Sequence, residues 1–307
     1  MAWAVDAPLA DPAPLTPPVG GGEGTDGGLP WWAWPILLFV TAFVLGIIAV
    51  LGGVGGGVLF VPIVAGFFPF HFDFVRGAGL LVALAGALAA GPGLLRSGMA
   101  NLRLAVPLSL IASFSAIIGA KIGLALPQHM VQVALGLTIL GIVGIMLYFK
   151  KSEYPDVPEA DALSSALKIS GVYHEPHMQK DINWHVHRTP QALALFVVIG
   201  LMAGMFGLGA GWANVPVLNL LMGVPLKVSV ATSKFMLGIV DTAAAWVYIN
   251  QGAVLALMVV PSIIGIMLGS MVGVRLLTRA NATVIRKVVL LVLTLAGVRA
   301  LLKGLGI

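Results

Sequence analysis

Cysteine is absent from the 307-residue chain, so disulfides, thiolate metal sites and cysteine nucleophiles are excluded. Charged residues are also scarce, at 9% of the chain where a soluble domain carries roughly 25%. Hydrophobic residues reach 59%, and the mean hydropathy is +1.03. Most of the surface must therefore face a lipid bilayer. The net charge of +5 does not indicate a nucleic-acid partner, because the basic residues lie in short loops beside apolar runs.

Motifs of enzyme chemistry are missing from the sequence as well. No nucleophile has a convincing neighbouring base, and no phosphate-binding loop is present. The glycine run Gly53–Gly57 lies between apolar segments, whereas a dinucleotide fingerprint needs a strand, a turn and a helix. We therefore expect a protein that is not an enzyme and that needs no cofactor.

The first thirty residues contain four acidic side chains and no basic one, among many prolines, glycines and alanines. This composition favours disorder. Because the basic start of a signal peptide is missing, the following apolar stretch is interpreted as a retained helix. We predict a disordered extracytoplasmic tail (1–30), two membrane halves (31–149 and 189–307) and a cytoplasmic connection between them (150–188).

The two halves carry the same pattern of glycines and prolines. The run Gly53–Gly57 recurs 154 positions later as Gly207–Gly211. Further pairs align at the same offset without a gap: Pro62 with Pro216, Gly98 with Gly252, and Pro107 with Pro261. Such agreement at residues that shape the backbone predicts an internal repeat. Each half has five apolar segments, the second of them short: about 31–51, 57–70, 74–95, 102–125 and 130–149, then 191–206, 211–222, 228–248, 254–276 and 284–302.

An odd number of segments in each half would insert the two halves with opposite orientation. If every segment crosses, twelve basic loop residues lie on the side of the connection and four on the other side. This bias places the connection in the cytoplasm and the protein in the inner membrane. We predict an all-α polytopic membrane protein of two inverted-topology repeats, whose short glycine-broken helices either cross or re-enter the membrane.

Glycines at the start of the short helices are the first candidates for a substrate site: Gly55, Gly56, Gly57, Gly209 and Gly211. Glycine lets the backbone approach a ligand, and the helix N-terminus behind it carries free N–H groups that suit an anion. Asn214 follows the second group closely and adds a polar side chain. The competing explanation of these glycines is tight helix packing.

The sequence Ala231-Thr232-Ser233-Lys234 places a lysine roughly 10 Å into its helix. An ammonium at that depth needs a partner, water or a route to the interface. We predict that Lys234 attracts an anionic substrate, to which Thr232 and Ser233 donate hydrogen bonds. Asp241, two helical turns further on, would carry a proton or balance charge. A structural ion pair between Lys234 and a neighbouring helix is the alternative.

The first half is poorer in such groups, because residues 77–80 (Gly-Ala-Gly-Leu) stand where the second half has Ala231–Lys234. Arg76 is interpreted as an interfacial anchor. In the second half, Gly265, Gly269 and Gly273 recur every four residues and predict close contact with a helix of this chain or of another copy.

Alternating residues in the connection, between about 167 and 187, predict a small β-hairpin. Four histidines lie in or beside it, at His174, His177, His185 and His187. Their spacings are compatible with zinc, even without cysteine ligands. We expect them to be solvated and to hold no metal.

A glycine run followed by a proline, once in each half, resembles the sulfite/organosulfonate exporters of the TauE/SafE (TSUP) family. The resemblance covers residues 40–300 and includes the elements Gly53–Gly57 with Pro62, Gly207–Gly211 with Pro216, Ala231-Thr232-Ser233, Gly252 and Pro261. It implies an inner-membrane exporter of sulfite, sulfoacetate or related sulfonates, with ligand contacts at Thr232 and Ser233. The first half lacks an Ala-Thr-Ser element, which argues against two-fold symmetric contacts.

Together these features predict a secondary transporter of small anions, working by alternating access at the glycine breaks. Proton coupling through Asp241 and uniport both stay open, and the residues do not fix the direction of transport. An anion channel or facilitator is one alternative. A membrane-embedded, metal-dependent sensor or enzyme that uses the histidines is another. A homodimer fits a compact transporter, although no residue requires one.

Overall fold

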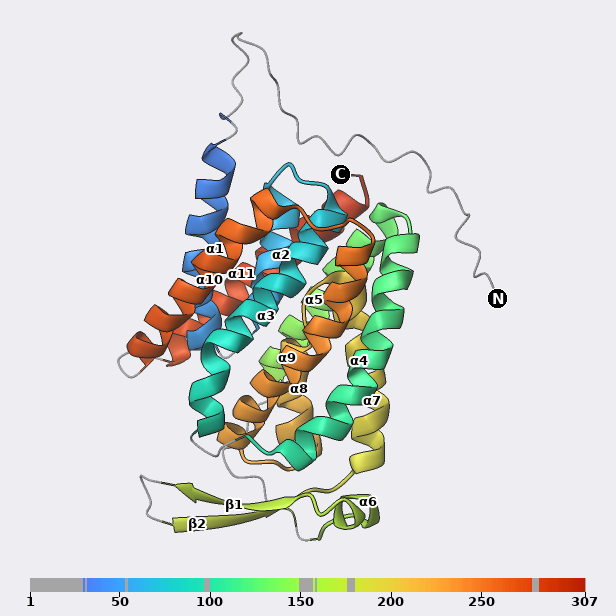
Figure 1. Cartoon of the computed structure of the whole chain (residues 1–307), viewed down its shortest axis with the longest axis vertical. Helices are drawn as coiled ribbons and strands as arrows, with labels where there is room; N and C mark the ends of the chain where they lie inside the picture. Colours follow the sequence, from blue (N-terminus) through green and yellow to red (C-terminus); the bar gives the residue numbers. More distant parts are fainter. Residues whose placement is uncertain are drawn as a thin grey trace.

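The computed structural model describes residues 30, 32–52, 55–96, 100–148, 157, 159–175, 180–277 and 282–306, so the predicted tail, apart from Pro30, lies outside the described residues. In these residues most of the chain is helical (Figure 1). The membrane helices are α1 (Ala33–Gly52), α2 (Gly56–Phe67), α3 (Phe72–Arg96), α4 (Leu102–Ala125), α5 (Gln128–Tyr148), α7 (Thr189–Phe206), α8 (Gly211–Pro216) with the π-helical turn η1 (Val217–Leu221), α9 (Leu226–Asn250), α10 (Ala256–Leu277) and α11 (Ala282–Gly304).

Seven of the described helices are long and apolar enough to cross a membrane. They are α1, α3, α4, α5, α7, α9 and α10, while α2 is apolar but shorter. Helix α11 has 23 residues, but basic side chains lie at both of its ends. The prediction of an all-α polytopic membrane protein is confirmed.

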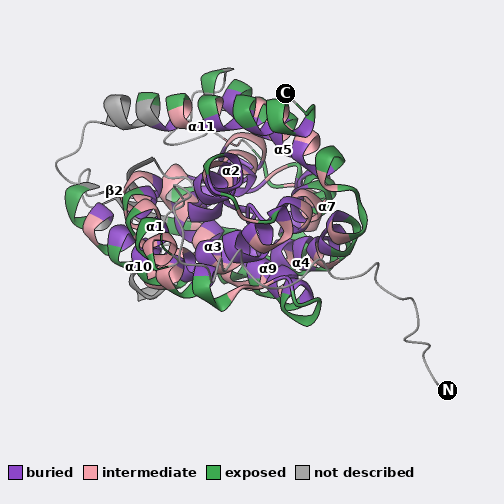
Figure 2. Cartoon of the chain, turned by 90° about the horizontal axis from the view of Figure 1, so that it is seen from above, coloured by how far each residue is buried: buried purple, intermediate pink, exposed green. Residues whose placement is uncertain are grey.

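The helices pack in reciprocal pairs. Helix α1 lies along α10 and α4 lies along α7, while α5 packs on α11 and α3 on α9. Helices α3 and α9 are the most enclosed spans, with 67% and 61% of the spanning window buried against 28% for α1 (Figure 2). If each helix is replaced by its counterpart in the other half, the same four pairs result. That exchange fits an internal repeat, but the inverted repeat itself stays a prediction.

Glycines allow the close approach of α10 to α1. A Cβ atom on Gly273 would lie 3.1 Å from the Ile47 carbonyl oxygen, and one on Gly269 would overlap the Phe43 carbonyl oxygen. On α1, a Cβ atom on Gly46 would lie 2.7 Å from the Ile266 carbonyl oxygen. The neighbour predicted for the glycines of α10 is therefore a helix of the same chain.

The connection between the halves forms a small layer at one end of the bundle (Figure 1). It holds α6 (Ala162–Ala166) and an antiparallel hairpin of β1 (Ser170–Glu175) and β2 (Lys180–His185), paired so that Ser170 faces His185. We call this end of the bundle the hairpin end and the opposite end the far end. His177 and the side chain of His174 lie outside the described residues. Among the described residues, no three His, Cys, Asp or Glu side chains are grouped closely enough to hold a metal ion.

Asp161 attaches this layer to α7. Its carboxylate accepts hydrogen bonds from the Ser164 N–H at 3.0 Å, which caps α6, and from the N–H and hydroxyl of Thr189, both at 2.9 Å. Partial burial raises the pKa of the carboxyl, but the hydrogen bonds outweigh it and leave the pKa below its usual value of 3.8. The connection is thus fixed to the first residue of α7.

Candidate functional site

The two glycine groups of the sequence meet inside the bundle. A Cβ atom on Gly211 would lie 3.2 Å from the Cα atom of Gly55, and one on Gly57 would lie 2.6 Å from the Leu208 carbonyl oxygen. All four residues are buried. Gly53 and Val54 lie outside the described residues. The structure therefore brings together Gly55, Gly56 and Gly57 of the first half with Gly209 and Gly211 of the second.

Neither short helix is long enough to cross the bilayer core of about 30 Å. The 12 residues of α2 rise about 18 Å, and α8 with η1 rises about 16 Å. Helix α2 occupies the half of the bundle toward the far end, and α8 the half toward the hairpin end (Figure 1). Both begin at the glycines. No side chain among the described residues caps the start of α2, so the positive end of its dipole lies at the glycines.

Asp241 faces this centre from α9. Its side chain is fully buried, and neither carboxylate oxygen has a hydrogen-bond partner among the described residues. The carboxylate packs on Gly209, where a Cβ atom would lie 2.8 Å from Oδ2. Gly209 has a φ of +71°, a conformation that favours glycine. The Ala210 N–H also faces the carboxylate, without meeting hydrogen-bonding geometry.

Lys234 lies two turns before Asp241 on the same helix and is half-buried. The described residues hold no ion pair of Lys234 within 4.0 Å. The predicted structural ion pair with a neighbouring helix is therefore not found in the described part of the chain.

The side-chain amide of Asn214 lacks hydrogen-bond partners among the described residues. It is fully buried, and neither its amide nitrogen nor its amide oxygen has a hydrogen-bond partner in the described part of the chain. Asn219, one helical segment further on, donates instead to the Val224 carbonyl at 2.9 Å. Three residues before Asn214, Gly211 packs against Leu237 of α9. Because α8 runs antiparallel to α9, Asn214 lies about 4.5 Å further along, at the level of Lys234.

The predicted hydroxyl contacts differ from each other. Thr232 and Ser233 are both buried on α9. The Thr232 hydroxyl accepts a hydrogen bond of 3.1 Å from the Asn101 N–H, in the connection that leads into α4. Thr232 thus joins the two halves near the hairpin end, and its contribution to a ligand would be limited to the hydroxyl proton. No such contact engages Ser233 among the described residues.

Sequence reasoning missed Trp212, the second residue of α8. Its indole N–H is buried and has no acceptor among the described residues. Indole nitrogens usually find a hydrogen-bond partner when they are buried. Its position directly after the second glycine group was the available signal. Trp212 therefore joins Asn214 as a buried donor beside the glycine breaks.

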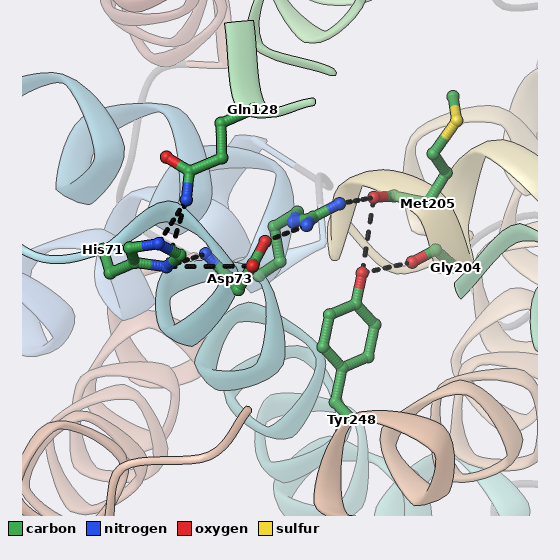
Figure 3. A network of polar contacts seen from close by, with 7 residues as sticks. His71, Asp73, Gln128, Gly204, Met205 and Tyr248 are labelled. Carbon is green, nitrogen blue, oxygen red and sulfur yellow. Dashed lines mark hydrogen bonds and ion pairs between the residues drawn. The ribbon is translucent and has the colours of Figure 1, made fainter. Parts of the chain in front are cut away.

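Arg76 is not the interfacial anchor that the sequence suggested. It is fully buried, donates to the Met205 carbonyl at 3.0 Å, forms an ion pair with Asp73, and packs on Phe72 and Tyr248. The Tyr248 hydroxyl donates to the Gly204 carbonyl at 2.9 Å (Figure 3). These contacts satisfy the last carbonyls of α7, which would otherwise lack partners in the membrane. Arg76 therefore joins the halves at the far end.

The chain was compared with known proteins. The family model described as Sulfite exporter TauE/SafE matches residues 38–300, which is most of the chain. The chain belongs to the TauE/SafE family. No solved structure matches this chain significantly. The family and the multi-pass plasma-membrane location expected from the sequence are confirmed.

Two relatives of this TauE/SafE protein carry transporter names. The "Probable membrane transporter protein ORF9" of Sinorhizobium sp is 28% identical over 268 residues, which cover 86% of this chain and 91% of the relative. The "Probable membrane transporter protein YunE" of Bacillus subtilis (strain 168) is 28% identical over 113 residues, which cover 37% of this chain and 41% of the relative. The TauE/SafE protein is thus a membrane transporter. It lies in a lipid bilayer and transports a small molecule.

Proposed function

We propose that this TauE/SafE protein exports a small anion, either sulfite or an organosulfonate such as sulfoacetate, by alternating access. The observation that carries this proposal is a pair of buried donors, Asn214 and Trp212, that have no partner among the described residues and lie beside the place where the two glycine breaks meet. Buried polar groups in proteins normally have partners. A ligand with several acceptor oxygens would supply them, and a sulfonate has three.

In this proposal the substrate lies between the start of α2 and α9. The first N–H groups of α2, the Asn214 amide, the Trp212 indole N–H and the Ser233 hydroxyl donate hydrogen bonds to its oxygens. Lys234 supplies the positive charge, since its ammonium has no ion pair within 4.0 Å among the described residues. The glycines leave room for the oxygens to approach the backbone.

Asp241 is proposed to bind and release a proton during the cycle. A buried carboxylate without a hydrogen-bond partner costs several kcal/mol in its charged form. Protonation removes that charge, and a nearby substrate anion would favour protonation further. A proton at Asp241 would therefore couple substrate movement to the pH gradient, whereas a uniporter would need no such group.

The proposed cycle opens the two ends of the bundle in turn. Arg76 joins the halves at the far end through Met205, and Asn101 joins them at the hairpin end through Thr232. Each contact would have to break when its own end opens. A channel would instead require both contacts to be open together, so saturable flux separates the carrier from the channel.

The test is flux into proteoliposomes that contain the full chain. Sulfite, sulfoacetate, taurine, sulfate and acetate would be compared, with and without a pH gradient. We expect saturable sulfite or sulfonate flux that falls roughly 10- to 100-fold in Lys234→Ala, the worth of one hydrogen bond to a charged group. Lys121→Ala, an exposed lysine on α4, is the matched control and should transport normally. Unchanged flux in Lys234→Ala would contradict the proposed site, and no flux for any anion in folded protein would contradict the substrate class.

A further inference from the structure

A groove at the hairpin end lies outside the proposed transport site. Its volume is about 450 Å³, and it is lined by Leu102, Arg103, Val106, Pro107 and Leu110 of α4 and by Leu167. Leu167 follows α6, outside the membrane helices. One wall of the groove therefore belongs to a membrane span and the other to the connection, which places the groove at the membrane interface.

The apolar wall of the groove continues into the lipid-facing surface of α4. Leu102, Val106, Leu110 and Phe114 recur every four residues and thus share one face of the helix. Their side chains are 50%, 43%, 61% and 70% exposed. Phe114 lies about 18 Å along the helix from Leu102, so the stripe runs from the interface deep into the hydrocarbon core. A soluble partner protein would not reach that depth.

One basic side chain lines the groove and a second follows its lining residue Leu167. Arg103 lines it and is exposed, and no described carboxylate forms an ion pair with it within 4.0 Å. Lys168 is exposed directly after Leu167. Asp161, the acidic residue that begins α6, already accepts the hydrogen bonds of Ser164 and Thr189. Asp161 forms no ion pair with Arg103 or Lys168 within 4.0 Å among the described residues.

The second wall is held in place by its own hydrogen bonds. Asp161 caps the start of α6, and at its end the Leu167 N–H donates to the Leu163 carbonyl at 3.0 Å. Lys168 has a φ of +52°, which turns the chain back so that the Ile169 N–H donates to the Ser164 carbonyl at 2.8 Å. Leu167 thus has a defined position against α4.

We propose that this groove binds an anionic phospholipid of the cytoplasmic leaflet. The phosphate headgroup contacts Arg103 and Lys168, and one acyl chain follows the exposed stripe of α4. A small free anion would gain nothing from the apolar walls, and a zwitterionic lipid would gain little from the two basic side chains. The bound lipid would bridge α4 and the connection. This inference does not depend on the identity of the transported substrate.

The test uses the full chain, purified in detergent and mixed with phosphatidylglycerol or phosphatidylcholine. Lipids retained per protein are counted by mass spectrometry of the intact complex. We expect preferential retention of one phosphatidylglycerol, with affinity roughly fivefold weaker in Arg103→Gln and in Lys168→Gln. Arg103→Lys should retain most of the binding. Lys121→Gln, at the opposite end of α4 and next to the exposed Ile122, should bind as the wild type does.

A second variant tests the groove apart from its charge. Val106→Trp fills the apolar wall at an exposed position and should abolish the preferential retention without changing any charge. Equal retention of the two lipids by the wild type, or unchanged retention in Val106→Trp or in the Arg103→Gln/Lys168→Gln double variant, would overturn the proposal. Displacement of the lipid by millimolar inorganic phosphate would also overturn it, in favour of a simple anion site.

Discussion

The buried polar side chains at the far end of the bundle differ from those at the centre in having hydrogen-bond or ion-pair partners. At the far end, Arg76 has Asp73 and the Met205 carbonyl as partners, and the Tyr248 hydroxyl has the Gly204 carbonyl. At the centre, Asp241 and Asn214 have no hydrogen-bond partner among the described residues, although both are fully buried.

This difference distinguishes polar groups that stabilise the fold from polar groups that are proposed to bind a ligand. A membrane protein has no water in the hydrocarbon core to satisfy a buried carboxylate or amide, so leaving one without a partner is costly. The far end lowers that cost, with Arg76 Nε left without a partner among the described residues, and it joins α3, α7 and α9. The centre has buried polar groups without partners among the described residues, beside the glycine breaks. We therefore expect variants at the far end to lose stability and variants at the centre to lose transport.

The largest effect is expected where the centre has no room for a side chain. In Gly57→Ala the new Cβ atom would lie 2.6 Å from the Leu208 carbonyl oxygen and 2.9 Å from that of Gly79. Both contacts are backbone, so the two halves would have to move apart. Displacing a site by about 1 Å can lower a rate about 100-fold, and we expect a loss of flux of that order.

Gly141→Ala in α5 is the matched control. No atom lies within 4 Å of its added Cβ, so flux should stay at the wild-type level. Alanine should also stabilise that helix by roughly 0.5–1 kcal/mol. Wild-type flux in Gly57→Ala proteoliposomes would mean that the meeting of the glycine breaks has no part in transport.

Arg76→Gln tests the structural side of the contrast. It leaves the Asp73 carboxylate without its cation and the Met205 carbonyl without its donor. Breaking a buried ion pair costs about 3–5 kcal/mol, and the half-buried position of Asp73 places this loss near 3 kcal/mol. Thermal unfolding in detergent measures it. The double variant Arg76→Gln/Asp73→Asn should recover part of the loss, and an unchanged melting temperature in the single variant would contradict a structural role.

Asp241→Asn should give the reverse result. The amide has nearly the same shape and removes a buried charge that has no hydrogen bond, so the protein should lose no stability and should gain some. Flux driven by a pH gradient should fall to the level measured without a gradient. A stability loss as large as that of Arg76→Gln would show that Asp241 is structural, and retained gradient-driven flux would exclude it as the proton carrier.

Local patterns in the sequence predicted the helices and the glycine breaks well, because both depend on residues that are close together in the sequence. Apolar runs gave the ten membrane helices to within a few residues, although α2 ends at Phe67, before Pro69, and not at Phe70. Long-range partners were not predictable. The Arg76–Met205 contact joins residues 129 positions apart, and the Asn101–Thr232 contact joins residues 131 apart.

Partners at that distance changed the interpretation of individual side chains. Without Met205 and Tyr248, Arg76 is interpreted as an interfacial anchor, and the sequence does not show that the Thr232 hydroxyl accepts a hydrogen bond from Asn101 across the two halves. Trp212 passed as an ordinary apolar residue because only the packing shows that its N–H lacks an acceptor. The π-helical turn η1 left no composition signal that distinguishes it from the rest of the short helix.

The smallest effect is expected at Asp161. Unlike the Asp241 carboxylate, its carboxylate accepts three hydrogen bonds, one from Ser164 and two from Thr189. Its hydrogen bonds to Ser164 and Thr189 hold its pKa below 3.8 in the folded protein. A lowered pKa stabilises the folded state above the unfolded value, and this contribution is lost as the pH falls below 3.8 through the folded pKa. Asp161→Ala should therefore loosen the connection by about 1 kcal/mol, the worth of a helix cap, at pH 6 and by less at pH 3. Hydrogen exchange in β1 and β2 measures the opening, with the exposed Glu159→Ala as control. If β1 and β2 exchange in Asp161→Ala as they do in the wild type at pH 6, the hydrogen bonds of the Asp161 carboxylate do not hold the connection to α7. Asp161 and Asp241 would then differ in burial alone.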